Sequence, residues 1–280
     1  MNLILQGAGI EAADASRVAA LSAARSVEQI ARSAWRLREV NESAEVAAAV
    51  ANYCEAHALD HACVPAGRRF ADLGLLAMDM DSTLITIECI DEIGGMLGIK
   101  PQIAAITERA MRGEMDFAES LRRRVALLEG LPLDGLDRVY EEKLALSPGA
   151  EMLVKRAQAS GIKTLLVSGG FTFFTERLKQ RLGLDHTLSN VLGIEDGKLT
   201  GRVTGPIVDA AAKAARLAEL TQVLGLGKER TLAIGDGAND LPMMAAAGIS
   251  VAYHAKPVVR AQATHALNHS GLDGVIHLFE

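Results

Sequence analysis

Two acidic residues that follow an apolar run are the first candidates for chemistry in this sequence. Asp79 and Asp81 stand one residue apart, directly after residues 73–78, which are apolar except for Gly74. Such a run predicts a buried strand, and on an extended chain residues i and i+2 point to the same face. Two neighbouring carboxylates repel each other and titrate as a coupled pair. A divalent cation would neutralise them, and Mg²⁺ favours carboxylate oxygens and shares the oxygens of substrate phosphates.

A second group of residues has the composition of an anion-binding site. Ser168, Gly169 and Gly170 follow a predicted strand and precede a predicted helix. Free backbone N–H groups at the start of a helix favour phosphate. Lys213, in an alanine-rich predicted helix, would balance the charge of a phosphoryl group. We therefore expect Ser168, the amide of Gly169 and Lys213 to bind phosphate.

A third group, Gly-Asp-Gly-Ala-Asn-Asp at residues 235–240, follows another predicted strand. We expect Asp236 to be a direct metal ligand, and Asn239 and Asp240 to orient metal-bound water or the loop. Carboxylates, a divalent ion, a phosphate-binding turn and a lysine are the equipment of phosphoryl transfer, in which catalysis rests on positioning and charge stabilisation. A carboxylate nucleophile is ionised at neutral pH and needs no activating base.

Each of these groups has a simpler explanation when it is considered alone. An Asp-x-Asp pair is usually a solvated turn, a Ser-Gly-Gly sequence usually starts a helix, and Lys213 would by default be exposed. The seven histidines show no HExxH spacing, Ser168 lacks the Gly-x-Ser-x-Gly context of serine hydrolases, and there is no P-loop. The joint occurrence of three polar groups at the ends of three predicted strands favours phosphoryl transfer.

The elements that must position these groups indicate an α/β fold. Predicted strands alternate with predicted helices, which is typical of a mostly parallel sheet covered by helices on both faces. Asp196-Gly197 predicts a hairpin turn. The main predicted strands lie at residues 73–79, 163–170, 231–237 and 249–253. In such sheets ligands bind beyond the carboxyl ends of the strands, so the three groups should meet at one edge.

The order of predicted elements and the positions of the polar groups divide the chain into three parts. Residues 1–70 read as a small module with the order β-α-β-α-β and carry no catalytic pattern, which favours a regulatory or interaction role over a structural appendage. Residues 71–85 and 147–280 are expected to form the core. Residues 86–146 are expected to form a helical segment inserted after the first strand of that core.

Composition and charge exclude several classes of protein. A chain of 280 residues with 49% hydrophobic residues can form a core domain and a smaller one. The net charge of −6 argues against nucleic-acid binding. We find neither a membrane-length apolar run nor a signal peptide, and the three cysteines form no CxxC pattern. We expect a cytoplasmic protein with a small-molecule substrate and no nucleic-acid or membrane partner, and a homodimer is left open.

Together, the motifs resemble those of the haloacid dehalogenase superfamily of phosphohydrolases, and within it those of the phosphoserine phosphatases. The four motifs of the superfamily correspond to Asp79-Met80-Asp81-Ser82-Thr83, Ser168, Lys213 and residues 235–240. The resemblance spans about residues 73–255, and Met80 departs from it, because Phe is common there. It implies a Rossmann-like core, a helical cap at residues 86–146 and an ACT-like module at residues 1–70.

The resemblance also implies roles for individual residues. Asp79 would be the nucleophile and a Mg²⁺ ligand. Asp81 would act as general acid and then as general base, and would bind Mg²⁺ through its carbonyl oxygen. Asp236 would bind Mg²⁺, Asn239 would contact the substrate, and Asp240 would organise the site. Ser168, Gly169 and Lys213 would bind phosphate.

The same resemblance implies a substrate, O-phospho-L-serine, and an activity that completes serine biosynthesis. Glu88 would bind the ammonium group of the substrate, and Arg124 would bind its carboxylate as a bidentate pair. Met111 and Phe117 would form the apolar lining. Without the resemblance, Arg124 would be read as one charge of a solvated Arg-Arg-Arg face.

Two rival functions stay open at this point. The first is the same chemistry on another small phosphate monoester, or transfer of the phosphoryl group to another alcohol. The second is an amino-acid-binding regulatory protein on an inactive phosphatase scaffold. The complete set of Asp79, Asp81, Ser168, Lys213 and Asp236 argues against the second.

Overall fold

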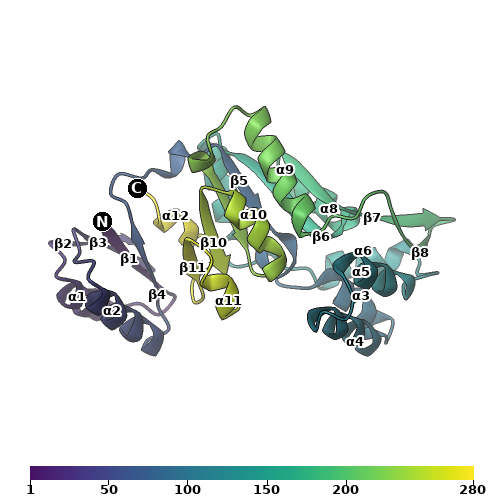
Figure 1. The fold of residues 1–280 in the computed structure, drawn as a ribbon, viewed down its shortest axis with the longest axis horizontal. Helices are drawn as coiled ribbons and strands as arrows, with labels where there is room; N and C mark the ends of the chain where they lie inside the picture. Colours follow the sequence, from purple (N-terminus) through teal and green to yellow (C-terminus); the bar gives the residue numbers. More distant parts are fainter.

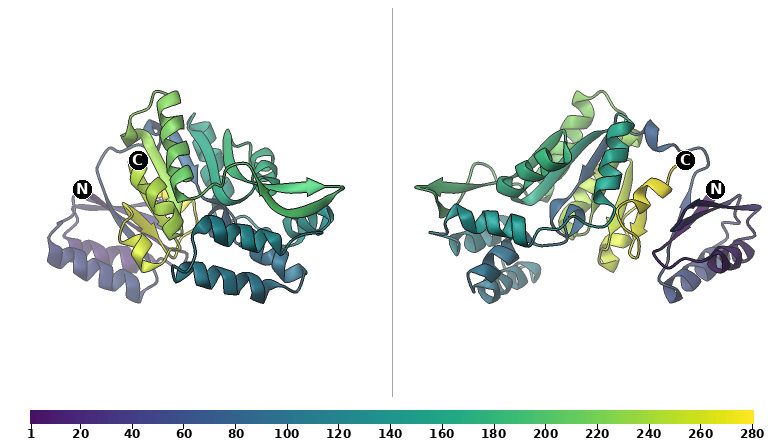
Figure 2. Two further views of the ribbon diagram at one scale, coloured as in Figure 1. Left: turned by 45° about the vertical axis from the view of Figure 1, so that its right-hand side comes forward. Right: turned by 180° about the vertical axis from the view of Figure 1, so that it is seen from behind.

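Two β-sheets organise the chain, and the computed structural model describes all residues from 1 to 280. A four-stranded sheet belongs to the N-terminal module, and a seven-stranded sheet belongs to the core. Figure 1 shows the module at one end of the molecule, the seven-stranded sheet in the middle and a bundle of helices at the other end. Both views of Figure 2 keep the module and the helical bundle on opposite sides of the core.

The N-terminal module has one strand more than its sequence predicts. Its elements are β1 (Asn2–Gln6), α1 (Ala12–Ser22), β2 (Ser26–Ala31), β3 (Ala34–Arg38), α2 (Ala44–Ala56) and β4 (Asp60–Val64). The missed strand, β2, lies at the sheet edge and is mostly exposed, so it lacks the apolar pattern that reveals a strand. The order β2-β3-β1-β4, with antiparallel pairs, is that of a ferredoxin-like β-α-β-β-α-β fold.

The core sheet has the order β11-β10-β9-β5-β6-β7-β8, and every pair is parallel except β7–β8. This confirms the predicted mostly parallel sheet and the hairpin, whose turn residues Asp196 and Gly197 both have positive φ angles, 50° and 73°. The strands are β5 (Leu75–Met78), β6 (Lys163–Phe171), β7 (His186–Glu195), β8 (Lys198–Thr204), β9 (Thr231–Gly235), β10 (Ile249–Tyr253) and β11 (His265–Leu267).

Helices cover both faces of this sheet, and the central strand β5 shows why they must. Leu76 and Met78 pack into one apolar cluster, while Leu75 and Ala77 pack into another on the opposite face. A strand that is apolar at every position needs cover on both sides. The covering helices are α7 (Ala150–Ala159), α8 (Thr172–Leu182), α9 (Ala210–Val223), α10 (Leu241–Ala246), α11 (Pro257–Arg260) and α12 (Gly274–His277).

The C-terminal end of the core differs from its prediction. The helix expected at residues 256–263 is the single turn α11, and the three-residue strand β11 follows it. The sequence does not reveal β11, because three residues are too few to show an alternating pattern. No helix in the structure has the length and apolar character that a membrane span requires.

Four helices between β5 and α7 form the helical bundle, and they lie beside the carboxyl end of the sheet (Figure 1). The isolated bridge between Ile85 and Leu146 joins the two chain segments that lead into and out of the bundle. A second bridge, between Pro132 and Lys198, ties the bundle to the β7–β8 hairpin. The helices are α3 (Cys89–Met96), α4 (Lys100–Met111), α5 (Phe117–Ala126) and α6 (Leu133–Glu142).

The N-terminal module is attached to the core by buried polar contacts as well as by apolar packing. The carboxylate of Asp60 accepts hydrogen bonds from the backbone N–H groups of Asn268, His269 and Ser270, at 2.7 to 3.0 Å. Ile4 of β1 also belongs to the main apolar cluster of the core. The module therefore has a fixed position against the C-terminal segment of the chain.

Candidate active site

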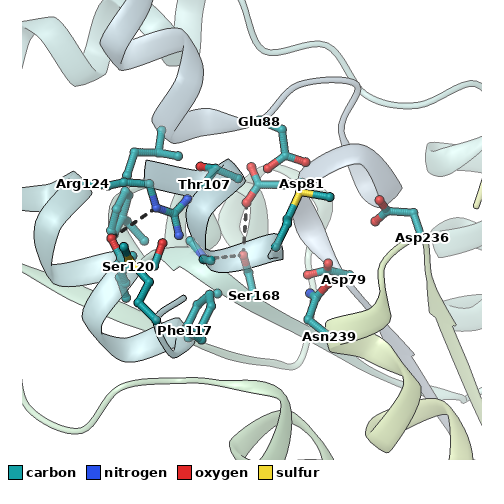
Figure 3. A pocket seen from close by; sticks show the side chains of 18 residues that line it. Asp79, Asp81, Glu88, Thr107, Phe117, Ser120, Arg124, Ser168, Asp236 and Asn239 are labelled. Atoms are coloured by element: carbon teal, nitrogen blue, oxygen red, sulfur yellow. Dashed lines mark hydrogen bonds between the residues drawn. The ribbon is translucent and has the colours of Figure 1, made fainter. Parts of the chain in front are cut away.

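A cavity of about 380 Å³ lies where the carboxyl ends of β5, β6 and β9 meet the helical bundle. Figure 3 shows side chains from the sheet and from the bundle pointing into it. Most of the residues predicted from the sequence line this cavity, namely Asp79, Asp81, Glu88, Met111, Phe117, Arg124, Ser168, Gly169, Asp236 and Asn239. The fold thus brings together groups that are far apart in the sequence.

Asp79 and Asp81 do not lie on one face of an extended strand, as the sequence pattern suggested. The strand β5 ends at Met78, and residues 80–84 form a single wide turn that begins right after Asp79. The chain turns because Ser82 adopts the left-handed conformation, with φ 55°. Both carboxylates still reach the cavity, but Asp81 approaches it from the turn and not from the strand.

A buried lysine stands behind Asp79. The Nζ atom of Lys213 lies 2.8 Å from Asp79 Oδ1 and 2.7 Å from Asp240 Oδ1. The lysine side chain is only 1% exposed. Burial lowers the pKa of Lys213, but attraction to the two carboxylates outweighs burial and raises this pKa above its ordinary value. Lys213 and Asp240 therefore form a charged support for Asp79, and neither lines the cavity itself.

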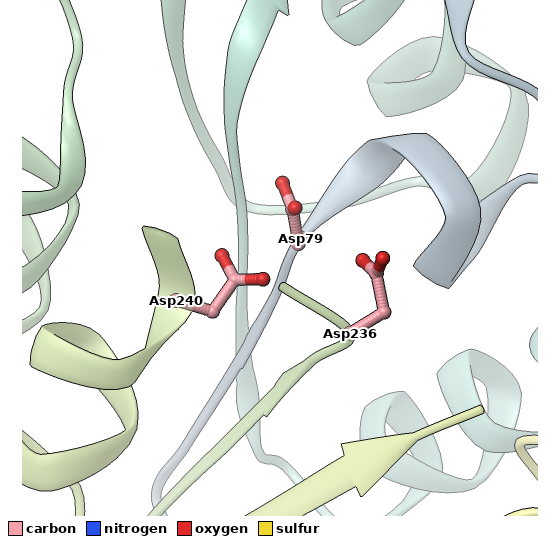
Figure 4. A group of neighbouring side chains, drawn as sticks. All are labelled: Asp79, Asp236 and Asp240. Atoms are coloured by element: carbon pink, nitrogen blue, oxygen red, sulfur yellow. The ribbon is translucent and has the colours of Figure 1, made fainter. Parts of the chain in front are cut away.

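Three carboxylates converge at the base of the site, from Asp79, Asp236 and Asp240 (Figure 4). One oxygen atom from each carboxylate can be chosen so that the three lie within 4.8 Å of one another. Asp236 accepts a hydrogen bond of 2.9 Å from the hydroxyl group of Thr83. Burial, together with the charge of Asp240, raises the pKa of Asp236 to about 6, and burial raises the pKa of Asp79 well above its usual range.

This base of the site fits a divalent cation. Lys213 is the one ammonium that contacts the acidic group, and it is already bound to Asp79 and Asp240. The carboxylate of Asp236 has no cationic partner, so buried negative charge is left in excess. Hard oxygen ligands around a compact site suit Mg²⁺. The sequence pattern predicted that the side chains of Asp79 and Asp81 would bind the same ion. In the structure the side chain of Asp81 lies outside the group of three carboxylates.

The carboxylate of Asp81 is held between the turn and the end of β6. Its Oδ1 accepts a hydrogen bond of 3.0 Å from the backbone N–H of Cys89, and its Oδ2 lies 3.4 Å from the hydroxyl oxygen of Ser168. Burial raises the pKa of Asp81. A raised pKa keeps a proton on a carboxyl group that must later donate it.

The end of β6 has no space for larger residues. A Cβ atom on Gly169 would lie 3.0 Å from the Phe117 ring, and one on Gly170 would lie 2.8 Å from Asp81 Oδ2. The backbone N–H of Gly170 donates a 2.8 Å hydrogen bond to the Ser168 hydroxyl group. These glycines let the backbone approach a bound anion closely.

Asn190 is a site residue that the sequence analysis missed. It is fully buried in β7, its amide nitrogen donates to the carbonyl oxygen of Gly169, and its amide oxygen accepts from the N–H of Val208, both at 2.8 Å. The side chain thus links the anion-binding turn to the segment that leads into α9, which carries Lys213. Asn190 stands just before the strand predicted at residues 191–195, and nothing in the sequence signals its role, because its partners are defined only in the fold.

The outer part of the cavity carries one acidic side chain, Glu88, and one cationic side chain, Arg124. Glu88 accepts a hydrogen bond of 2.7 Å from the hydroxyl group of Ser82. Burial and the charge of Asp81 raise the pKa of Glu88 to about 7. Arg124 is half-buried and makes no ion pair within the chain, so its guanidinium group is free to bind a carboxylate.

The helices of the bundle supply further lining residues that the sequence analysis did not single out. They are Ile90, Thr107, Ala110, Met115, Ser120 and Leu121. Met111, which was predicted to be apolar lining, is 68% exposed and lies at the rim. Helix periodicity alone does not show which residues of a bundle face a cavity and which face the neighbouring helix.

Comparisons with known proteins agree with this geometry. The family model of haloacid dehalogenase-like hydrolases matches residues 76–245, and a model of a domain of unknown function matches residues 3–46. A phosphoserine phosphatase of Polaromonas sp. strain JS666 is 54% identical over 215 residues, which are 75% of this chain and 91% of that protein.

Solved structures show the same similarity in three dimensions. The unliganded crystal structure of a probable phosphoserine phosphatase from Vibrio cholerae has a TM-score of 0.87 and 40% identity, and covers 99% of this chain and 86% of that one. A substrate-bound complex of a phosphoserine phosphatase has a TM-score of 0.69 and 35% identity, and covers 74% of this chain and 99% of that one.

Proposed function

This chain belongs to the haloacid dehalogenase-like hydrolases, and we propose that it hydrolyses O-phospho-L-serine to L-serine and phosphate, the activity that completes serine biosynthesis. The observation that carries this function is the composition of one cavity. It holds Asp79 and the anion-binding turn at its base, and it holds Glu88 and Arg124 in its outer part. These groups match the phosphate, the ammonium and the carboxylate of phosphoserine.

The chemistry begins with Asp79. A carboxylate oxygen of Asp79 attacks phosphorus and forms an O–P bond, while the bond between phosphorus and the serine oxygen breaks. Asp81 donates its proton to the leaving serine oxygen. Water then attacks the aspartyl phosphate, Asp81 takes a proton from that water, and phosphate leaves with Asp79 regenerated.

The other residues of the site bind and orient. Ser168 and the amide of Gly169 bind the phosphoryl oxygens, Lys213 adds positive charge to the phosphoryl group from behind Asp79, and Asp240 holds Lys213 in position. Asn239, in the turn that follows the carboxyl end of β9, contacts the substrate. Mg²⁺ would be held by the carboxylates of Asp79 and Asp236 and the carbonyl oxygen of Asp81, and it would neutralise charge on the phosphoryl group.

The parts of the chain contribute differently to this function. We assign residues 71–85 and 147–280 to the catalytic core and residues 86–146 to a cap, which supplies Glu88 and Arg124 and excludes water. We assign residues 1–70 to an ACT-like regulatory or interaction module. The three free cysteines are consistent with our proposal of a cytoplasmic location.

Phosphate release from O-phospho-L-serine, measured with Mg²⁺ and after treatment with EDTA, tests the function. We expect turnover with Mg²⁺, loss of turnover in EDTA, and recovery when Mg²⁺ is added in excess. A panel of sugar and nucleotide phosphates provides the comparison. If one of these gave a kcat/KM roughly tenfold above that of phosphoserine, the serine assignment would be wrong, and the rival phosphatase or phosphotransferase function would replace it.

Truncated substrates test the roles of Arg124 and Glu88 separately. We expect Arg124→Gln to lower kcat/KM for phosphoserine by roughly 10- to 100-fold, because a charge-assisted pair is lost. The variant should barely affect O-phosphoethanolamine, which has no carboxylate. Glu88→Gln should show the reverse selectivity, with a large loss on phosphoserine and little loss on 3-phosphooxypropanoate, which has no ammonium group.

The exposed neighbour Arg122 offers the matched control for these kinetics. Arg122→Gln removes the same charge from the same helix and should leave kcat/KM for phosphoserine unchanged. Equal losses on phosphoserine and O-phosphoethanolamine in Arg124→Gln would show that this arginine does not bind the carboxylate.

Two substitutions of Ser82 separate its hydrogen bond from its backbone conformation. Ser82→Ala and Ser82→Gly both remove the hydroxyl group that holds Glu88, so both should lower kcat/KM by about tenfold. Glycine tolerates the positive φ angle of this position, whereas alanine does not. The free energy of unfolding of Ser82→Gly should therefore be about 1 kcal/mol higher than that of Ser82→Ala. Urea denaturation and steady-state kinetics measure the two effects; unchanged kinetics in both variants would refute the positioning of Glu88 by Ser82.

A further inference from the structure

A second cavity, of about 460 Å³, lies between the N-terminal module and the core. Its lining includes residues of β4 and β11. Figure 1 shows these strands on the side of the core away from the helical bundle, so the cavity is separate from the active site. The volume is in the range of small-molecule sites, which often occur where two domains meet. No residue of the catalytic machinery lines it.

The walls of this interdomain cavity come from two edge strands and the helices beside them. β4 is the edge of the four-stranded sheet, and β11 is the edge of the seven-stranded sheet. The three hydrogen bonds from residues 268–270 to Asp60 hold these two edges in place. The cavity is therefore part of the fixed structure, and a ligand would meet a preformed site.

The lining is mixed, and most of its large apolar side chains come from the module. The module contributes the side chains of Leu3, Val46 and Val50. The core contributes Arg260 and His265, which lie at either end of the short segment between α11 and β11. An apolar lining interrupted by a few polar groups is the usual composition of a site for an amphipathic small molecule.

Two polar side chains of the core wall, Arg260 and His265, have no partner for their polar groups within the protein, whereas Thr264 pairs with Ser250. Arg260 makes neither an ion pair nor a side-chain hydrogen bond. His265 is 9% exposed, and its Nε2 atom is buried without a hydrogen-bond partner. A buried unpartnered nitrogen is costly, and it indicates a missing ligand or solvent group. Burial, helped by the charge of Arg68, lowers the pKa of His265 to about 4, so the imidazole is neutral and has one N–H to donate.

The charges around this cavity favour an anion. Arg260 is unpaired, and the positive charge of Arg68 contributes to the lowered pKa of His265. Glu42, the acidic residue of the lining, is already paired with the N-terminal ammonium group of Met1 at 3.5 Å. No free carboxylate is left in the lining to bind an ammonium group.

We propose that the interdomain cavity binds a small organic acid, a carboxylate with a short aliphatic body. The carboxylate lies against Arg260 and accepts a hydrogen bond from the Nε2–H of His265. The aliphatic body packs against Leu3, Val46 and Val50. This is a binding site in addition to the active site, on a different face of the protein.

Alanine methyl NMR distinguishes the two sites directly in the full-length protein. Ala47, Ala62 and Ala266 line the interdomain cavity, whereas Ala110 lines the active site. Titration with 4-methylpentanoate should change the methyl chemical shifts of Ala47, Ala62 and Ala266 and leave the methyl chemical shift of Ala110 unchanged. The neutral analogue 4-methylpentanamide is the matched ligand and should bind at least about tenfold more weakly.

Two exposed positions provide variants that should fold normally. Arg260→Gln should weaken the binding of 4-methylpentanoate by at least about tenfold. Ala47→Phe should fill the cavity and prevent binding. Both variants should keep the wild-type kcat/KM for phosphoserine. The proposal is overturned if 4-methylpentanoate shifts none of the three signals, if it shifts only Ala110, or if Arg260→Gln binds as tightly as the wild type. The NMR experiment does not measure phosphatase activity. A negative result would therefore refute the second binding site and leave the proposed phosphatase function unaffected.

Discussion

Asp79→Asn should lower kcat for phosphoserine by roughly 10⁴-fold or more, the scale seen when a nucleophile is removed. Asparagine has nearly the same shape as aspartate, but its amide oxygen is a poor nucleophile. Lys213 keeps its second partner, Asp240, in this variant, so the protein should stay folded. Phosphate release and circular dichroism measure the two properties.

The control for this experiment is Asp196→Asn, at the exposed turn of the β7–β8 hairpin. Asparagine tolerates the positive φ angle of that position as well as aspartate does, so activity should be unchanged. A second measurement is the covalent intermediate itself, since acid-quenched wild-type enzyme should retain label from ³²P-phosphoserine and Asp79→Asn should not. Unchanged turnover in Asp79→Asn would remove the proposed mechanism.

Lys213→Met should destabilise the protein and inactivate it. The substitution leaves the carboxylates of Asp79 and Asp240 buried without their shared cation. Breaking a buried ion pair on one side costs about 3–5 kcal/mol, so urea denaturation should show a loss of that size. Activity should fall by roughly 10³-fold, because a charge that stabilises the transferred phosphoryl group is lost.

The pH dependence of Lys213→Met gives a further check. Without the lysine, the pKa of Asp79 rises further above that of the unfolded chain, because the attraction of the ammonium group is lost. A folded state that binds more protons than the unfolded state gains stability as the pH falls, so the deficit of the variant should shrink from pH 7 towards pH 5 in EDTA. Lys198→Met, at the exposed hairpin turn, is the matched control and should be unchanged in stability and activity.

These experiments would also separate support from direct contact in the site. Lys213 and Asp240 stand behind Asp79 and do not line the cavity, whereas Ser168 and Asp81 do. A double substitution of Lys213 and Asp240 to uncharged residues should recover part of the stability lost in Lys213→Met, because both buried charges are then removed. Activity should not recover, since the phosphoryl group still lacks its cation.

The sequence alone identified the chemistry of this protein. Polar groups at the ends of apolar runs are local signals, because a buried strand needs apolar residues and a phosphate-binding turn needs small ones. Asp79, Ser168 and Asp236 could therefore be assigned to strand ends, and the parallel sheet followed from the alternation of elements. The hairpin at Asp196 was equally local, since its turn requires residues that accept positive φ angles.

Only the tertiary structure decided how these groups are arranged. The strand β11 and the partners of Asn190 depend on contacts between segments that are distant in the sequence, and local preferences carry no information about such contacts. The same holds for the turn that places Asp81 and for the pairing of Lys213 with Asp240 across 27 positions. The cavity beside His265 exists because edge strands of the two sheets, β4 and β11, come together. Packing between distant elements, and not the preferences of either one, sets these distances and therefore the charge and shape of each site.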